Sequence, residues 1–148
     1  MKTIWSRIEG WLGANAPQLL PRLAAPASDE ALACLARGLG FAVPAELEAS
    51  LRVHDGATLL ASWDLLSAQE ILAEHRIWRG LLDGGDLSGR IASPSMGVRG
   101  VWWSPRWIPI TSDGAGNSLC IDLDPAESGR PGQIMTLWHD DGRPCHAP

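Results

Sequence analysis

Two aspartates, Asp122 and Asp124, are the residues best placed to do chemistry, because they stand two positions apart in a predicted strand. Side chains with this spacing share one face of a strand, so the two carboxylates could act together on a glycosidic bond or hold a metal ion. The structural alternative is that they end the strand, with Asp124 capping the turn that begins at Pro125. We favour this alternative and predict no catalytic residue, since fold and residue type alone license no reaction.

Other groups give weaker indications of a site. The segment 113–117 lacks the alternating oxygen ligands and closing Glu of a calcium loop, so a turn is the better interpretation. His139, Cys145 and His146 lie close together in sequence, with Cys120 as a further candidate, but they lack the paired spacing of a zinc site. No glycine pattern stands between a strand and a helix, as phosphate binding requires. We therefore predict neither a metal ion nor a cofactor.

The elements that position these residues belong to a chain of ordinary globular composition. Its 148 residues are 45% hydrophobic and 20% charged, which fits a single domain. No run of about 18 apolar residues is available to span a membrane. Arg7 and Glu9 interrupt the N-terminal segment that would have to form an apolar signal core. Because the 3 cysteines follow no pairing pattern, we expect a reduced, cytoplasmic chain.

The charge pattern is acidic and uneven. A formal net charge of -5 disfavours a protein that binds the nucleic-acid backbone directly. Acidic residues gather in segments 44–75 and 107–129; Arg52 is the only Lys or Arg in the first, and the second has none. If the two segments share a face, its negative potential would attract a basic partner. The alternative is an acidic surface that is merely solvated.

Four segments carry helix patterns. Near the N-terminus, apolar residues recur at helical spacing until Pro17 and Pro21. These apolar residues are Ile4, Trp5, Ile8, Trp11 and Leu12. The other three helices are predicted from the residues at their ends. The second helix begins at Ser28 and stops at Gly40, and the third begins at Pro44 and runs to 54–56. The fourth begins at the capping box of Ser67 and Glu70 and stops at 84–85. His54 and His75 fall at helical positions and are interpreted as packed or capping residues.

The C-terminal part changes to a period of two. Strands are predicted at 57–60, 107–111, 118–123 and 133–138, and in the third of these Leu119, Ile121 and Leu123 face inward. Short connections between the last three strands favour an antiparallel meander. Segment 83–105 has no period and predicts a long loop, either mobile or functional. Helices first and strands later predict an α+β fold, with N-terminal helices packed on a mainly antiparallel sheet.

The order of short motifs is more specific than any one of them. They are 5–12, 26–30, 39–40, 43–47, 54–56, 107–110, 113–117, 119–125, 129, 132–134 and 139–140. Together and in this order they resemble the SUKH superfamily, in its Smi/Knr-type branch. That branch includes fungal cell-wall-assembly regulators and bacterial immunity proteins of polymorphic toxin systems. The resemblance implies a single Smi/Knr-like α+β domain over 1–148 and a binding role. Family members usually continue past the segment 139–140 into a final helix, whereas this sequence stops at Pro148. We therefore expect that helix to be missing, either because the natural protein is short or because this is a truncated form.

The resemblance and the acidic bias together predict an immunity protein that neutralises a cognate toxin, often a nuclease, by direct binding. A basic nuclease site suits an acidic inhibitor. The predicted partner-binding residues are Asp55, Trp63, Asp64, Asp113, Asn117, Asp122 and Asp124, with Trp63 and Asp122 at the centre. The alternative is a general regulatory interaction module of the cell-wall-regulator type. Neither function involves a cofactor, a membrane or direct contact with nucleic acid, and the oligomeric state is left open.

Overall fold

The computed structural model describes residues 1–58, 63–140 and 145–146. The chain divides into two compact units, Met1–Leu72 and Ala73–Pro148, and each is described by itself. The single domain predicted for 1–148 stays a prediction. Of the strand predicted at 57–60, residues 59 and 60 lie outside the described residues. The segment after Asp140, which bears on the missing final helix, is described only at Cys145–His146.

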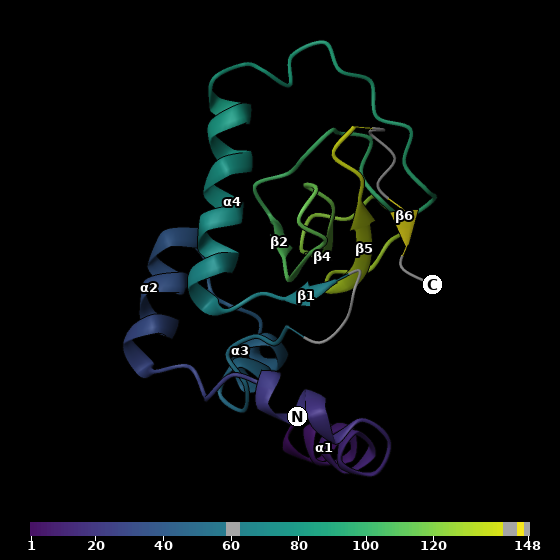
Figure 1. The fold of residues 1–148 in the computed structure, drawn as a ribbon. Helices are drawn as coiled ribbons and strands as arrows, with labels where there is room; N and C mark the ends of the chain where they lie inside the picture. The colour runs from purple at the N-terminus through teal and green to yellow at the C-terminus, as the bar shows by residue number, and fades with distance from the viewer. Residues whose placement is uncertain (59–62, 141–144, 147–148) are drawn as a thin grey trace. The chain divides into compact units, whose positions relative to one another are not determined.

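The first unit is built mainly from helices (Figure 1). They are α1 (Lys2–Asn15), the 3₁₀ helix η1 (Pro17–Arg22), α2 (Asp29–Leu39), α3 (Ala45–Leu51) and the start of α4 (Ala68–Asp83), with the short strand β1 (Asp64–Leu65) before α4. The buried apolar residues of α2 and α3 are Leu32, Leu35, Leu39, Leu47 and Leu51. The third helix ends at Leu51, earlier than the predicted end at 54–56.

Local capping sets the ends of α2 and α4 as predicted. Ser28 Oγ accepts a hydrogen bond from the backbone N–H of Ala31 over 3.1 Å, and Gly40 ends α2 with a φ of 77°. At α4, the Ser67 N–H donates to Glu70 Oε2 over 2.8 Å, and the Glu70 N–H donates to Ser67 Oγ over 3.3 Å. This reciprocal pair is the predicted capping box.

Gly56 has a conformation and surroundings that only glycine fits. Its φ is 90°, and a Cβ at this position would lie 2.8 Å from both the Leu65 carbonyl oxygen and the Ser67 backbone nitrogen. An L-residue would therefore be strained and would also collide with backbone atoms. This explains the glycine in motif 54–56 as a structural requirement.

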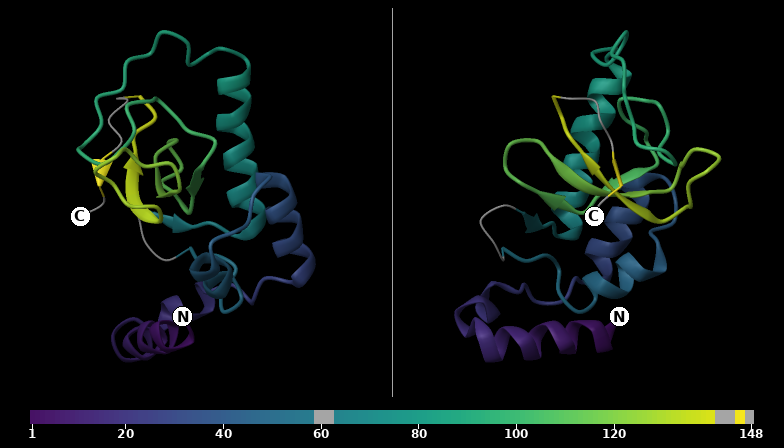
Figure 2. Two further views of the ribbon diagram at one scale, coloured as in Figure 1. Left: turned by 180° about the vertical axis from the view of Figure 1, so that it is seen from behind. Right: turned by 90° about the vertical axis from the view of Figure 1, so that its right-hand side faces the viewer.

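The second unit contains a four-stranded antiparallel sheet in the order β2–β4–β5–β6. The strands are β2 (Trp107–Pro109), β4 (Ser118–Asp122), β5 (Gln133–Leu137) and β6 (Cys145–His146), while the short β3 (Thr111–Ser112) follows β2 in sequence. Helix α4 runs along this sheet (Figures 1 and 2). The predicted α+β fold and the antiparallel arrangement are confirmed.

The face of β4 that lies in the core differs from the prediction. Ser118, Cys120 and Asp122 are at most 1% exposed, whereas Leu119 and Leu123, which were predicted to face inward, are partly exposed. Ile121 is buried as predicted. The prediction was wrong for this strand because the core of the unit contains several indole rings. Small and polar side chains on β4 leave room for such rings, so alternation of apolar residues does not mark the inner face.

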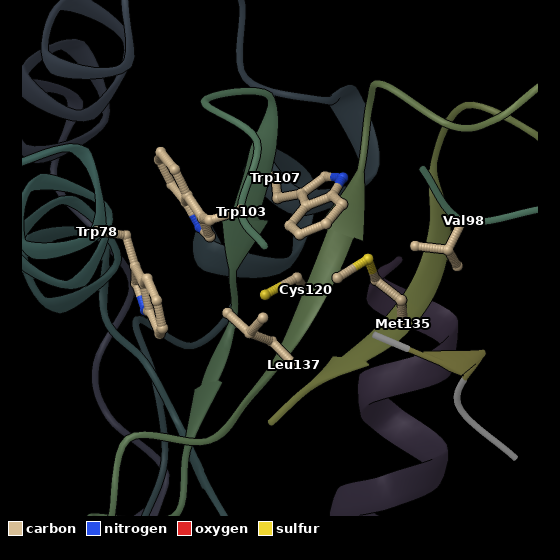
Figure 3. Packing of buried hydrophobic residues seen from close by; sticks show 7 residues of the cluster. All are labelled: Trp78, Val98, Trp103, Trp107, Cys120, Met135 and Leu137. Carbon is tan, nitrogen blue, oxygen red and sulfur yellow. The ribbon is translucent and has the colours of Figure 1, made fainter. Parts of the chain in front are cut away.

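Three tryptophans dominate that core (Figure 3). The cluster comprises Trp78 of α4, Val98 and Trp103 of segment 84–106, and Trp107, Cys120, Met135 and Leu137 of the sheet. The rings of Trp78 and Trp103 stack with centroids 6.4 Å apart. Segment 84–106 forms no helix or strand, as predicted for a loop, yet it supplies Val98 and Trp103, each 3% exposed. The segment is thus part of the core.

Candidate interaction surfaces

One face of α1 is fixed to the first unit by polar contacts. The indole Nε1 of Trp5 donates to Ser50 Oγ over 3.0 Å. Glu9 Oε1 lies 2.9 Å from His54 Nε2, and His54 Nδ1 donates to the Ala24 carbonyl oxygen over 2.7 Å. The rings of Trp5 and His54 also meet edge to face, with centroids 4.7 Å apart. His54 is therefore a packed residue, as predicted, and it holds α1 in place.

Three apolar residues of α1 are uncovered, whereas Trp5 and Leu12 are buried. Ile4, Ile8 and Trp11 are 51%, 36% and 61% exposed, and their spacing of four and three residues places them on one side of the helix. They line an open groove of about 790 Å³ between α1 and η1, together with Arg7, Leu12, Ala16 and Leu19. The chain turns back after α1, so that η1 lies beside it (Figure 2). Sequence periodicity predicted the helix but not its uncovered face.

Arg7 gives this groove its charge. Among the described residues it is the only charged side chain in the lining, and it forms no salt bridge with any of them. Glu9, the only acidic residue of α1, lies against His54 instead. The groove therefore presents exposed apolar side chains next to an unpaired guanidinium group.

Asp122 is completely buried in the second unit. Its Oδ1 accepts hydrogen bonds from the Trp107 indole over 2.9 Å and from the Asp124 N–H over 2.8 Å. Its Oδ2 accepts from Gln133 Nε2 over 2.8 Å. These contacts join the ends of three strands, so Asp122 supports the sheet and offers no surface to a partner.

Asp124 ends the same strand and is also engaged within the unit. Its Oδ2 forms a salt bridge with Arg99 and accepts a hydrogen bond from Ser104 Oγ over 2.8 Å. The pair of carboxylates considered for catalysis thus consists of one buried structural group and one ion-paired group. Both residues therefore have structural roles, but among the described residues the side chain of Asp124 contacts Arg99 and Ser104 and does not cap the turn at Pro125 as predicted.

Asp113 and Asn117 close the turn between β3 and β4. Asp113 Oδ1 accepts from the N–H groups of Ala115 and Asn117 over 2.8 and 3.0 Å, and Oδ2 accepts from Asn117 Nδ2 over 2.6 Å. Burial pushes the pKa of Asp113 upward, but these hydrogen bonds outweigh it and hold that pKa below its ordinary value. Asn117 Oδ1 accepts from the His139 N–H over 3.0 Å. The two residues therefore form a turn, as the sequence predicted for this segment.

The other three predicted partner-binding residues belong to the first unit. Asp55 Oδ1 accepts from the Ala68 N–H over 2.7 Å, so it caps the first turn of α4 and places a negative charge at the positive end of that helix. Trp63 and Asp64 are half-buried, and Asp64 begins β1. Nothing in the structure assigns the seven predicted residues to one surface, and their partner-binding role stays a prediction.

Many acidic side chains of the two acidic segments are engaged in contacts within the chain. Glu48 pairs with Arg52 over 2.9 Å, and Glu70 completes the capping box of α4. The acidic residues at 55, 113, 122 and 124 are engaged as described above. Glu46 and Glu127 remain exposed. The acidic residues of the two segments therefore serve largely to cap helices, close turns, form ion pairs or support the sheet.

The second unit has a smaller cavity of about 290 Å³. Its walls are mainly apolar, and its charged lining residues include Glu74 and Arg90. The Arg90 guanidinium lies 4.9 Å from the centre of the Trp102 ring, as in a cation–π contact. Burial raises the pKa of Glu74, and the nearby Trp78 indole opposes that rise. Both cavities therefore bring a single arginine next to exposed or half-buried tryptophan.

The described part of the chain contains neither a cluster of metal-ligating side chains nor a membrane-spanning helix. Within residues 1–58, 63–140 and 145–146, no three potential metal-ligating side chains come together. Burial, followed by the charges of Glu74 and Asp122, raises the pKa of Cys120 and keeps this thiol protonated, whereas metals bind the thiolate. No helix in these ranges has the length and apolarity needed to cross a membrane.

Comparison with protein families decides the relationship. Residues 26–145 match the model of the SMI1 / KNR4 family (SUKH-1). The chain belongs to this family. The resemblance inferred from the order of motifs is thereby confirmed. Helices α1 and η1 precede the matched region, so membership in the SMI1 / KNR4 family does not by itself indicate what the α1 groove binds.

Fungal relatives in the SMI1 / KNR4 family are named as regulators. The chain is 29% identical over 155 residues to the "Cell wall biosynthesis/cell cycle regulator smi1" of Schizosaccharomyces pombe, covering 92% of this chain and 31% of the relative. It is 25% identical over 177 residues to the "Glucan synthesis regulatory protein" of Neurospora crassa, covering 92% and 33%. The "Cell wall assembly regulator SMI1" of Saccharomyces cerevisiae is 40% identical over 47 residues, which cover 32% of this chain and 9% of the relative. The chain spans about a third of the length of the first two relatives.

Proposed function

We propose that this chain is a regulatory interaction module that acts by binding a partner protein rather than by catalysis. The observation that carries the proposal is the uncovered face of α1, with Ile4, Ile8 and Trp11 exposed along a groove of about 790 Å³. Contiguous exposed apolar residues on soluble proteins mark interaction sites. The names of the fungal relatives, which describe regulators of the cell wall and of glucan synthesis, support the regulatory part of the proposal.

The way α1 is held makes this face suitable for binding. Trp5 and Glu9 fix the helix from its other side, through Ser50 and His54. The uncovered face is therefore pre-arranged, which lowers the entropy that a partner must overcome on binding. Substitutions at Ile8 and Trp11 leave these anchoring contacts in place, so they test binding separately from folding.

Quantitative affinity purification from the source cells tests the proposal. The tagged chain is compared with an Ile8→Ser, Trp11→Ser double variant and with Ile77→Ser. Ile77 is a control with matched exposure on a different surface: it is 59% exposed on α4, close to the 61% of Trp11, and it lines the 290 Å³ cavity of the second unit. We expect a defined partner to co-purify with the unsubstituted chain and with the control, and to be lost from the double variant. Equal recovery with all three chains would refute the proposal, provided that their melting temperatures agree.

A second candidate function is the neutralisation of a basic protein toxin by direct binding. The observation that favours it is the net charge of -5, with Glu46 and Glu127 exposed. The test is co-expression with a toxic domain encoded by a neighbouring gene, for which this function requires protection of the cells. Electrostatic steering also requires an association rate that falls steeply with salt. Absence of protection would exclude this function.

A further inference from the structure

We propose that the groove between α1 and η1 binds an amphipathic helix of the partner, and that this helix places an acidic side chain against Arg7. The inference rests on the proposed function and specifies the chemistry of the partner. It uses three observations: the helical walls of the groove, the spacing of its exposed apolar residues, and its single unpaired charge.

The helical walls favour a helical occupant. The 14 residues of α1 form a helix of about 21 Å, in which backbone N–H and C=O groups bond to each other. Such a wall offers no row of free backbone groups with which an extended peptide could pair. A helix satisfies its own backbone and needs only side-chain contacts. Helices that bind in grooves use apolar anchors at positions i, i+3 or i+4, and i+7.

The exposed residues of α1 have the same spacing as those anchors. Ile4, Ile8 and Trp11 stand at i, i+4 and i+7, and Leu19 on η1 adds an apolar side chain on the other wall. A stripe with like spacing on a second helix can pack between these side chains over several turns. Trp11, at 61% exposed, has the largest surface to bury and is the expected central anchor.

The charge of Arg7 specifies the polar part of the partner. A helix that covers the groove removes water from this guanidinium group, which is costly unless a carboxylate replaces the lost hydration. Glu9 cannot supply this carboxylate, because its Oε1 lies 2.9 Å from Nε2 of His54. An Asp or Glu beside the apolar stripe of the partner supplies the missing charge and can form two parallel hydrogen bonds with arginine.

Other occupants fit the charges less well. A second copy of the chain arranged about a two-fold axis would bring two Arg7 side chains to one interface, and like charges there are unfavourable. An anionic lipid surface would attract Arg7 but would repel a chain of net charge -5. A partner helix that carries its own acidic residue avoids both penalties.

Selection from a displayed library of random peptides of about 16 residues tests the inference with the full chain as bait. Peptides that still bind the Ile8→Ser, Trp11→Ser variant are removed by counter-selection. We expect the enriched peptides to carry apolar residues at i, i+3 or i+4, and i+7, with an adjacent Asp or Glu. Arg7→Glu should weaken their binding about tenfold, whereas Arg37→Glu, a charge reversal at an exposed position on α2, should leave it unchanged. Replacing the acidic peptide residue by Lys should restore binding to the Arg7→Glu variant.

The outcomes separate this inference from the proposed function. The inference would be overturned by enriched peptides that are basic, that lack the apolar spacing, or that bind the Arg7→Glu variant as well as the unsubstituted chain. In that case a partner whose recovery depends on α1 would still support the proposed function. The inference is also overturned if no peptide is enriched, or if the double substitution abolishes self-association or binding to phosphatidylserine vesicles. A partner whose recovery does not depend on α1 would instead overturn the proposed function.

Discussion

The indole Nε1 of Trp107 donates a hydrogen bond to Asp122 Oδ1 over 2.9 Å, and neither side chain has any exposed surface. The two residues are also register partners across β2 and β4. Gln133 on β5 and the N–H of Asp124 donate to the same carboxylate. Buried polar groups in folded proteins are hydrogen-bonded in this way, so the interaction belongs to the stability of the sheet.

Asp122→Ala should therefore destabilise the fold. The substitution leaves the donors of Trp107, Gln133 and Asp124 without their acceptor, at an expected cost of about 3 kcal/mol or more in the free energy of unfolding. Urea denaturation followed by tryptophan fluorescence measures this change, with Glu127→Ala as an exposed control that should stay within about 0.5 kcal/mol. A variant of unchanged stability that no longer binds its partner would show instead that Asp122 acts in recognition.

His75 should make stability depend on pH. It is 2% exposed, and its Nε2 lies 2.9 Å from the Pro105 carbonyl oxygen. Burial lowers the pKa of His75, and the positive charge of Arg79 lowers it further, while the hydrogen bond to the Pro105 carbonyl raises it by less. The unfolded chain takes up this proton at about pH 6.5, before the folded chain does, so the free energy of unfolding should fall as pH decreases through that value.

The variant His75→Gln tests this dependence, because a glutamine amide can still donate to the Pro105 carbonyl. Urea midpoints of both proteins are compared at about pH 7.5 and about pH 5.5. The loss of stability between these values should be smaller in the variant. The same loss in both proteins would mean that other groups are responsible.

Glu74 should have the opposite effect. Burial, opposed by the Trp78 indole, raises its pKa above the ordinary 4.5, so the folded chain takes up this proton first as pH falls. The ionised form is thus the disfavoured one at neutral pH, and Glu74→Gln should raise the free energy of unfolding there. The gain should shrink as pH approaches about 4.5, where the unfolded chain also becomes protonated. Thermal melts across this range measure the difference, and a variant less stable at neutral pH would contradict the assignment.

Gly56→Ala should be costly. The positive φ of 90° and the 2.8 Å approach of a Cβ to the Leu65 carbonyl predict a loss of about 1–3 kcal/mol. Gly10→Ala provides a matched control, because a Cβ there meets nothing within 4 Å and lies in the middle of α1. That substitution should stabilise the helix by about 0.5–1 kcal/mol. Equal effects of the two substitutions in chemical denaturation would refute the role given to Gly56.

How far the sequence predicts this fold depends on how many positions along the chain separate the interacting residues. The ends of α2 and α4 follow from Ser28, Gly40 and Ser67, because caps form within one helical turn. The role of Asp122 cannot be predicted in this way, since its partners at 107 and 133 come from neighbouring strands.

The same limit applies to the candidate site. Helical periodicity predicts α1, but the buried side is chosen by Ser50 and His54, which each lie 45 positions from the residue they contact. A local pattern cannot show that part of an apolar stripe stays uncovered. The acidic residues stood out in the sequence, although most of them proved to cap helices, close turns or form ion pairs.

The central claim is that the uncovered face of α1 binds the partner. The most direct test is the dissociation constant of the purified partner for the unsubstituted chain, Trp11→Ser and Ile77→Ser, measured by calorimetry. We predict that Trp11→Ser weakens binding about 30-fold or more, as for a central anchor worth about 2 kcal/mol, while its melting temperature is unchanged and Ile77→Ser binds normally. Binding of Trp11→Ser within about threefold of the unsubstituted chain would contradict the account.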